Sequence, residues 1–145
     1  MNYRHTQIGY LIIFVFFLAI LYFGILFTHA GLNPKVVFII IPIFFILIFF
    51  VTLNVMIDKN YLRIKFGYGI FRKQFILKEI ISVRIVKNHW YYGWGIRGWL
   101  QSRMLIFNVS GFDAVEIKMK NGKTYRIGTD EPEKLEYAIM QAIKR

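Results

Sequence analysis

The side chains that could carry out catalysis are few in this sequence, and they lie far apart. The chain has three histidines, His5, His29 and His89. No spacing pairs them as metal ligands, which come in convergent sets of three or four. The serines stand in no nucleophile motif, and the chain has no cysteine. We therefore expect no catalytic residue, no metal site and no cofactor, and we interpret the protein as a non-enzyme.

One segment, residues 90–99, concentrates aromatic rings and holds all three tryptophans of the chain. Its candidate interaction residues are Trp90, Tyr91, Tyr92, Trp94, Arg97 and Trp99. The glycines between them match neither a Walker loop nor a dinucleotide fingerprint. Trp and Tyr are favoured at bilayer interfaces and in binding hot spots, so we predict a functional surface here. The alternative is that the rings fill the domain or pack against its own helices.

Four acidic residues gather near the C-terminus, namely Asp130, Glu131, Glu133 and Glu136. Carboxylates at this spacing could ligate a metal ion. Acidic side chains are also favoured in the first turn of a helix, because the positive end of the helix dipole attracts them. The second interpretation explains the cluster without a ligand, and we adopt it.

Basic residues form a second candidate surface. All eight acidic residues lie at or after Asp58, as do 17 of the 19 Lys and Arg, so residues 58–145 carry +9 of the net charge of +11. The basic residues nearest to the apolar first part of the chain are Lys59, Arg63, Lys65, Arg72 and Lys73. Basic residues beside a membrane are attracted by anionic lipid, so we expect these five to face the inner leaflet. A solvated basic face is the alternative, and a nucleic-acid interface explains the charge less simply.

The elements that position these residues begin with two apolar runs. Residues 8–27 and 36–57 are runs of 20 and 22 residues without a charge. About 20 apolar residues in a helix span the hydrocarbon core of a bilayer, so we predict two transmembrane helices. The connector over 28–35 contains Gly, Asn and Pro and favours a turn between them. A cleaved signal peptide is the alternative for the first run, which exceeds the roughly 7–15 apolar residues typical of such peptides.

The distribution of Lys and Arg predicts the orientation of this hairpin. The connector holds only Lys35, whereas the N-terminal tail has Arg4 and the region after the second run is rich in basic residues. The positive-inside rule then places both termini in the cytoplasm. We predict a multi-pass inner-membrane protein with a two-helix anchor over 1–57 and a cytoplasmic domain over 58–145.

After residue 58 the apolar residues recur with a period of two. Leu62, Ile64 and Phe66 alternate with polar neighbours, as a half-buried strand requires. Further strands are predicted at 73–77, 81–87, 105–109, 115–120 and 124–127. Asn121 and Gly122 separate the last two runs and predict a β-hairpin with a type I′ turn.

The chain is predicted to end in one amphipathic helix. Asp130 is the expected N-cap, with Glu133 in capping-box spacing and Pro132 in the first turn. The apolar stripe consists of Leu135, Ala138, Ile139, Ala142 and Ile143. Its spacing matches one face of an α-helix, so we expect it to pack on the strands.

Three segments carry a resemblance to a known family. They are residues 88–99 (NHWYYGWGIRGW), 108–117 (NVSGFDAVEI) and 121–135 (NGKTYRIGTDEPEKL). Together they resemble small bacterial membrane proteins with two N-terminal transmembrane helices and a bacterial pleckstrin-homology-like (PH-like) domain, over about residues 55–145. The resemblance implies a membrane α-helical hairpin plus an α+β domain, namely a PH-like antiparallel β-barrel or sandwich closed by one C-terminal helix. It implies no reaction.

We therefore expect a non-enzymatic, membrane-anchored interaction or scaffold module at the cytoplasmic face. An accessory or assembly subunit of a larger membrane protein complex is the alternative. The expected partners are the anionic inner leaflet of the bilayer, a membrane or cytoplasmic protein, and a second copy of the chain.

Overall fold

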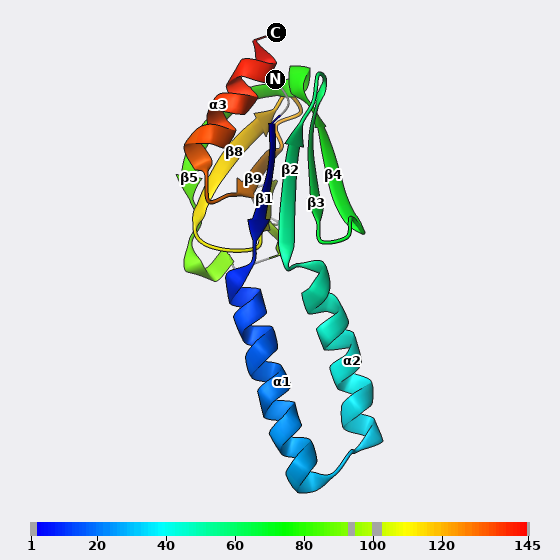
Figure 1. Cartoon of the computed structure of the whole chain (residues 1–145). Helices are drawn as coiled ribbons and strands as arrows, with labels where there is room; N and C mark the ends of the chain where they lie inside the picture. The colour runs from blue at the N-terminus through cyan, green and yellow to red at the C-terminus, as the bar shows by residue number, and fades with distance from the viewer. Residues whose placement is uncertain (1–2, 93–94, 100–102, 145) are drawn as a thin grey trace.

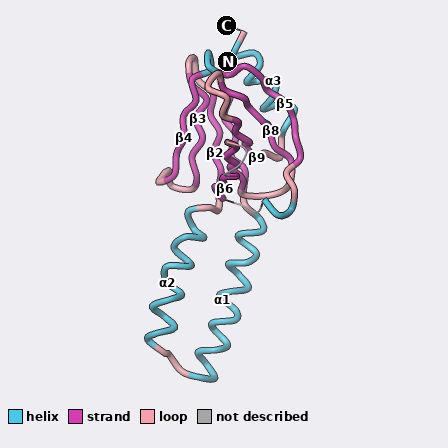
Figure 2. Tube along the Cα trace, turned by 180° about the vertical axis from the view of Figure 1, so that it is seen from behind, coloured by secondary structure: helices cyan, strands magenta, loops and turns pink. Residues whose placement is uncertain are grey.

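The computed structural model describes residues 3–92, 95–99 and 103–144, which form a helical hairpin and a β-rich body (Figure 1). Helix α1 spans Tyr10–Ala30 and helix α2 spans Pro34–Phe49. The two helices run side by side away from the body, and the chain termini lie at the body's opposite end (Figures 1 and 2). Asn33 begins α2 as its N-cap, because its Oδ1 accepts a hydrogen bond of 3.0 Å from the Lys35 amide.

The two helices differ in length. Among the described residues, α1 is the one helix that is long and apolar enough to cross a bilayer. Helix α2 is also apolar but has only 16 residues. This criterion rests on length and composition alone, and a signal sequence near an N-terminus meets it too. The membrane-spanning role of the hairpin therefore stays a prediction.

The second apolar run folds differently from its prediction. The helix predicted over 36–57 is wrong beyond Phe49, because Thr52–Ile57 forms strand β2. In this strand Leu53, Val55 and Ile57 are buried at alternate positions, which is the period of a strand. The residues between them are uncharged, so the change from helical to strand period is hidden inside one continuous apolar run.

The N-terminal tail also belongs to the β-rich body. Tyr3–Ile8 forms strand β1, and α1 follows it over Tyr10–Ala30 instead of the predicted 8–27. Strand β1 pairs with β2 in an antiparallel register from Tyr3 opposite Ile57 to Ile8 opposite Thr52. The predicted anchor over 1–57 therefore contributes two strands to the body as well as the helical hairpin.

Strands β1 to β4 form sheet A, which is antiparallel throughout and has the order β1-β2-β3-β4. Strand β3 spans Tyr61–Phe66 and β4 spans Phe71–Ile76. One face of sheet A covers the core, and we call the opposite face its outer face. The alternation predicted for β3 is confirmed, because Leu62, Ile64 and Phe66 are buried on the core side.

The remaining strands form sheet B, with the order β5-β8-β9-β7-β6. They are β5 (Ile80–Lys87), β6 (Gly95–Trp99), β7 (Met104–Asn108), β8 (Asp113–Met119) and β9 (Thr124–Gly128). Two short 3-10 turns flank β5, namely η1 (Leu77–Glu79) and η2 (Trp90–Tyr92). Strand β7 runs parallel to β9, while the other pairs are antiparallel.

Part of the predicted fold class is confirmed. The chain has a helical N-terminal region, two sheets and a C-terminal helix, which is an α+β arrangement. Over the described residues the two sheets are separate and do not close into one barrel, and the parallel β7–β9 pair corrects the antiparallel prediction. Strand β6 falls within a segment predicted as a break, because Gly95 and Gly98 interrupt its side-chain alternation.

The predicted β8–β9 hairpin is confirmed, but its turn is of another type. Gly122 has a φ of 81°, whereas Asn121 does not have a positive φ, so the type I′ prediction is wrong. The Gly122 amide donates to the Met119 carbonyl at 3.0 Å, and the Met119 amide donates to the Lys123 carbonyl at 2.9 Å. The glycine thus serves as the single left-handed residue that follows a tight turn.

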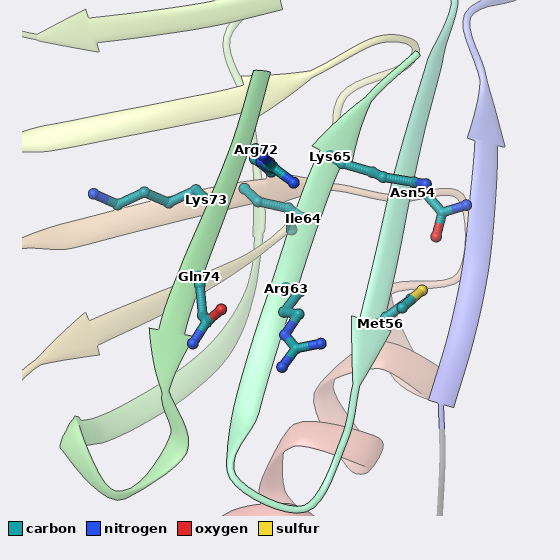
Figure 3. A pocket seen from close by; sticks show the side chains of 8 residues that line it. All are labelled: Asn54, Met56, Arg63, Ile64, Lys65, Arg72, Lys73 and Gln74. Atoms are coloured by element: carbon teal, nitrogen blue, oxygen red, sulfur yellow. The ribbon is translucent and has the colours of Figure 1, made fainter. Parts of the chain in front are cut away.

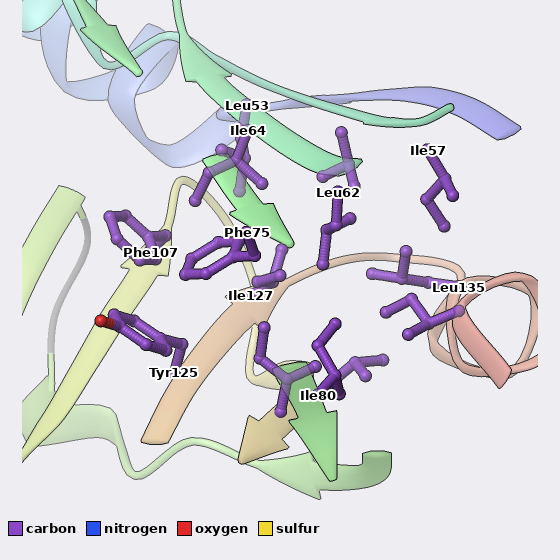
Figure 4. Packing of buried hydrophobic residues seen from close by; sticks show 14 of the residues in the cluster. Leu53, Ile57, Leu62, Ile64, Phe75, Ile80, Phe107, Tyr125, Ile127 and Leu135 are labelled. Atoms are coloured by element: carbon purple, nitrogen blue, oxygen red, sulfur yellow. The ribbon is translucent and has the colours of Figure 1, made fainter. Parts of the chain in front are cut away.

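The core lies between the two sheets and extends under the C-terminal helix (Figure 4). Sheet A contributes Leu53, Leu62 and Ile64, and the facing strands contribute Phe107 and Ile127. Aromatic rings bridge the sheets, since Phe75 packs on Tyr125 with their ring centroids 4.6 Å apart. This contact places β4 over β9 and orders the two sheets relative to one another.

Helix α3 spans Pro132–Ile143 and packs against β5, β8 and η1. Its predicted apolar stripe is confirmed, since Leu135 and Ile139 are fully buried. The predicted cap is wrong, because the N-cap position is held by Glu131 without a side-chain cap bond. Asp130 instead binds His5 of β1, with 2.5 Å between its Oδ1 and His5 Nε2. The N-terminal strand and the C-terminal helix are thereby linked.

Candidate functional site

The base of the helical hairpin is joined directly to sheet A. A single residue, Gly9, separates β1 from α1, and its amide donates to the Val51 carbonyl at 2.6 Å. A Cβ on Gly9 would lie 2.9 Å from the Val51 oxygen and 3.0 Å from the Val109 oxygen. Both distances are too short for a side chain, so glycine is needed where the helix leaves the sheet.

The turn between β3 and β4 packs on the other helix of the hairpin. Gly67 has a φ of 48°, and its amide donates to the Thr52 carbonyl at 2.8 Å. A Cβ at this position would lie 2.6 Å from the Phe49 oxygen at the end of α2. The loop between β7 and β8 is fixed as well, because Gln7 Nε2 donates to the Ser110 carbonyl at 3.0 Å. Short connections and these contacts hold the body in one orientation relative to the hairpin.

Three loops at this end of the body carry large exposed apolar side chains. We call them the hairpin-end rim, and its members are Tyr68, Ile70, Trp90, Tyr91 and Phe112. Tyr68 and Trp90 are the most open, at 84% and 77% exposed. The three loops are the β3–β4 turn, η2 and the β7–β8 loop, and all lie at the end from which the helices project (Figures 1 and 2). Exposed apolar groups gathered on one side of a domain indicate an interaction surface.

An ion-pair network centred on the buried carboxylate of Glu116 holds η2 in place. Glu116 Oε2 accepts from Arg126 Nε at 2.8 Å, and Glu116 Oε1 accepts from Arg84 Nε at 2.7 Å. Burial alone would raise the pKa of the Glu116 carboxyl, but the hydrogen bonds from both guanidinium groups outweigh it and lower that pKa. Arg126 also lies over the Tyr92 ring, 5.7 Å from its centroid. The network thus positions the turn that presents Trp90 and Tyr91.

The structure describes only part of the predicted aromatic surface. Trp90 and Tyr91 are exposed, and Tyr92 is half-buried beside Arg126. Trp94 lies outside the described residues. Arg97 and Trp99 have their backbones in β6, but their side chains also lie outside what the structure describes.

Sequence reasoning missed the other loops of the hairpin-end rim. Tyr68 stands between two glycines in the β3–β4 turn, and Phe112 follows Gly111 in the β7–β8 loop. A large ring beside a turn glycine is the signal that could have identified both residues, because such a turn exposes its side chains.

The outer face of sheet A bears two transverse rows of side chains, which are polar except for Met56. Strand registers place Thr6, Asn54, Lys65 and Arg72 side by side in the row nearer to the hairpin. The next row consists of Arg4, Met56, Arg63 and Gln74. The face is therefore basic. Thr52, the first residue of β2, lies at the edge of this face next to the hairpin.

The members of these rows on β2, β3 and β4 border a hollow of about 390 Å³ (Figure 3). Its polar lining residues are Asn54, Arg63, Lys65, Arg72, Lys73 and Gln74. Arg63 has a carboxylate partner, because its Nη2 lies 3.1 Å from Asp58 Oδ2. Within the described part of the chain, Lys65 and Arg72 have no salt-bridge partner, so two positive charges face the hollow uncompensated.

The five predicted basic residues do not share one surface. Lys59 lies in the β2–β3 turn at the end of sheet A away from the hairpin. Arg63, Lys65 and Arg72 share the outer face, with Lys65 and Arg72 nearest to the hairpin. Lys73 points to the other side of β4, where its Nζ lies 6.0 Å from the Tyr125 ring. The chain folds back at the β2–β3 turn, so closeness in sequence to the helix did not predict closeness in space.

The acidic cluster forms internal contacts. His5 binds Asp130, and Glu131 accepts a hydrogen bond of 2.6 Å from Lys134. Burial, together with the charges of Glu131 and Asp130, raises the pKa of the Tyr3 hydroxyl to about 12. No group of three or more potential metal-binding His, Asp or Glu side chains occurs in the ranges that the structure describes.

We compared the chain with protein-family models, curated proteins and solved structures, and none matched. The resemblance to bacterial PH-like membrane proteins therefore stays a prediction that rests on the three quoted sequence segments and the order of the elements.

Proposed function

We propose that this chain is a non-enzymatic, membrane-anchored interaction module of the bacterial inner membrane. In this proposal α1 and α2 cross the bilayer and both termini are cytoplasmic. The β-rich body lies against the cytoplasmic leaflet. The body is a PH-like domain that presents its exposed faces and strand edges to a membrane or cytoplasmic protein.

The hairpin-end rim is the observation that carries this proposal. Trp and Tyr concentrate at the level of lipid head groups, where one part of the ring contacts apolar chains and the polar atom meets water. Tyr68, Trp90, Tyr91 and Phe112 are exposed on the side of the body from which both helices leave. A bilayer that covers the hairpin would reach this rim, and it would give these rings an apolar environment.

The composition of the hairpin supports the same arrangement. At about 1.5 Å per residue, α1 is roughly 32 Å long and matches a hydrocarbon core of about 30 Å, whereas α2 is roughly 24 Å long and covers most of it. Apolar side chains on all sides of both helices are exposed, and the facing contacts include the edge-to-face pair of Phe16 and Phe44. A helix that is apolar all round needs an apolar environment, which lipid supplies.

Charge supports the cytoplasmic placement of the body. The tip of the hairpin carries Lys35, whereas the outer face of sheet A alone carries Arg4, Arg63, Lys65 and Arg72. The positive-inside rule assigns the basic side to the cytoplasm. Sheet A and the hairpin are joined through Gly9 and Val51, so the orientation of one determines that of the other.

An accessory subunit of a larger membrane complex is the second candidate. It is favoured by the wide apolar surface that α1 and α2 leave uncovered, because helices of another protein could pack there as well as lipid. Purification of the full chain in mild detergent separates the two. A stoichiometric membrane partner supports the subunit, and an isolated chain supports the module.

Topology can be tested directly because the chain has no native cysteine. Leu32→Cys marks the tip of the hairpin, and Asn121→Cys marks the β8–β9 turn at the far end of the body. A membrane-impermeant maleimide added to intact spheroplasts is expected to label Leu32→Cys. It should label Asn121→Cys only after the membrane is permeabilised. Labelling of Asn121→Cys in intact spheroplasts would contradict the proposed orientation.

A further inference from the structure

The row of side chains on the outer face nearest to the hairpin combines a hydroxyl, an amide and two cations. Lys65 lies directly opposite Arg72 in the β3–β4 register. Like charges directly opposite on neighbouring strands destabilise a sheet. The described residues place no carboxylate in salt-bridge contact with either cation. An anion bound between Lys65 and Arg72 would remove this repulsion.

Asn54 provides a second observation at the same place. Its side chain lines the hollow, yet the residue is only 9% exposed. Asn54 Nδ2 donates to Thr6 Oγ1 at 2.8 Å, whereas Asn54 Oδ1 is buried without a hydrogen-bond partner among the described residues. Lys65 extends across β2 toward this amide (Figure 3). If an anion drew the Lys65 ammonium toward itself, the amide oxygen would become open to a hydroxyl donor.

The height of this row above the hairpin matches the head-group layer. Lys65 lies two residues before Gly67, whose amide binds Thr52 at the base of α2. Two residues of strand correspond to about 7 Å. The polar layer on each side of a bilayer is roughly 5–8 Å thick, by the difference between its total and hydrocarbon thickness. In the proposed orientation Lys65 and Arg72 therefore lie at the level of lipid phosphates.

We propose that this hollow binds the head group of an anionic phospholipid that carries hydroxyl groups next to its phosphate. Lys65 and Arg72 bind the phosphate oxygens, and the side-chain amide of Asn54, which Thr6 holds in place, binds a head-group hydroxyl. The inference rests on the proposed membrane attachment, because that attachment brings the row to the lipid surface. The site would make the module selective for one class of lipid, beyond general attraction to negative charge.

The test uses the full chain in nanodiscs that contain equal parts of phosphatidylglycerol, phosphatidylserine and phosphatidylcholine. Native mass spectrometry, after gentle release of the chain from the nanodisc, measures how much of each lipid stays bound to it. Wild type is expected to retain phosphatidylglycerol in preference to the other two. The double variant Lys65→Gln/Arg72→Gln should bind it about tenfold or more weakly, since each basic contact to anionic lipid contributes a several-fold gain.

A matched control carries the same charge change elsewhere. Lys118 and Lys120 are exposed near the far end of sheet B, so Lys118→Gln/Lys120→Gln should retain the wild-type lipid preference. Asn54→Leu should still bind anionic lipid but lose the preference for phosphatidylglycerol over phosphatidylserine, because only the hydroxyl contact is removed. A thermal melt of each variant reports whether its fold is retained.

Several results would overturn the proposed site. An equal loss of phosphatidylglycerol binding in both double variants would indicate diffuse electrostatic attraction. Equal retention of all three lipids by wild type would show that the hollow does not select a lipid. Displacement of the lipid by sn-glycerol 3-phosphate at similar affinity would assign the hollow to a soluble ligand. A chain that does not insert into nanodiscs contradicts membrane anchoring itself, whereas a chain that inserts without enriching phosphatidylglycerol contradicts this site alone.

Discussion

At the scale of single residues, Gly67 determines how closely the β3–β4 turn approaches α2. Its φ of 48° is strained for other residues, and a Cβ would lie 2.6 Å from the Phe49 carbonyl oxygen. Gly67→Ala is therefore expected to lower the free energy of unfolding by about 2–4 kcal/mol, from backbone strain and overlap combined. Thermal unfolding of the full chain in detergent measures the change.

Gly111 provides the matched control for that experiment. It also has a positive φ, 70°, but a Cβ there meets no atom within 4 Å. Gly111→Ala should cost about 1 kcal/mol, from backbone strain alone. Equal losses in the two variants would show that contact between the turn and α2 does not constrain the hairpin.

Glu116 gives the fold a dependence on pH. Its carboxyl has a lower pKa in the folded chain than the ordinary value of 4.5, because hydrogen bonds from Arg126 and Arg84 outweigh the effect of burial. Such a group stabilises the fold above the unfolded pKa, and this contribution is lost as the pH falls through the folded pKa. The melting temperature of wild type should therefore fall below about pH 4.5 more steeply than that of Glu116→Gln. Glu133→Gln, which changes an exposed carboxyl, should retain the wild-type profile.

The sequence reveals the candidate residues but not which of them meet. Asn54 lies in a continuous apolar run. The pattern of that run indicates a polar residue near the end of a helix. Its place beside Thr6 and Lys65 follows from the registers of β1, β2 and β3, which join residues far apart in the chain. Cross-strand neighbours of this kind depend on the whole sheet, so local patterns could not identify the row.

At the scale of elements, the contact between α3 and the sheets is the clearest prediction from sequence. Leu135 is fully buried in this contact. Leu135→Asp is expected to lower the free energy of unfolding by a few kcal/mol, because it places a charge in the core. Denaturant unfolding followed by circular dichroism measures the change.

Tyr137 lies two residues along the same helix and is exposed. Tyr137→Asp adds the same charge on the solvent side, and it should change stability by less than about 0.5 kcal/mol. A similar loss of unfolding free energy in Leu135→Asp and Tyr137→Asp would contradict the packing of α3 on β5 and β8.

Elements with strong local periodicity could be predicted, and the others could not. The stripe of α3 and the alternation of β3, β8 and β9 stand out because polar residues separate the apolar ones. Strand β2 is concealed by an apolar run that continues from α2 without a charge. The parallel pairing of β7 with β9 is a property of topology, which periodicity does not report.

At the scale of the whole molecule, the helical hairpin is an insertion between two neighbouring strands of one sheet. Strand β1 leads into α1 through Gly9, and α2 leads into β2 through two residues, Phe50 and Val51. A body attached at two adjacent strands cannot rotate freely on its anchor, as it could on one flexible linker. The same end of the body is therefore always turned toward the hairpin, which is why the position of its exposed rings has consequences for function.

The central claim is that the hairpin-end rim lies in the interface of the bilayer. The most direct measurement is the depth of nitroxide spin labels on single cysteines in proteoliposomes, read from their relative accessibility to oxygen and to a water-soluble nickel complex. The labelled variants are Tyr68→Cys, Trp90→Cys and Phe112→Cys, and Asn121→Cys at the far end of the body is the control. We expect the three rim labels to report the interfacial layer and the control to report bulk water. Rim labels as accessible to nickel as the control would contradict the account.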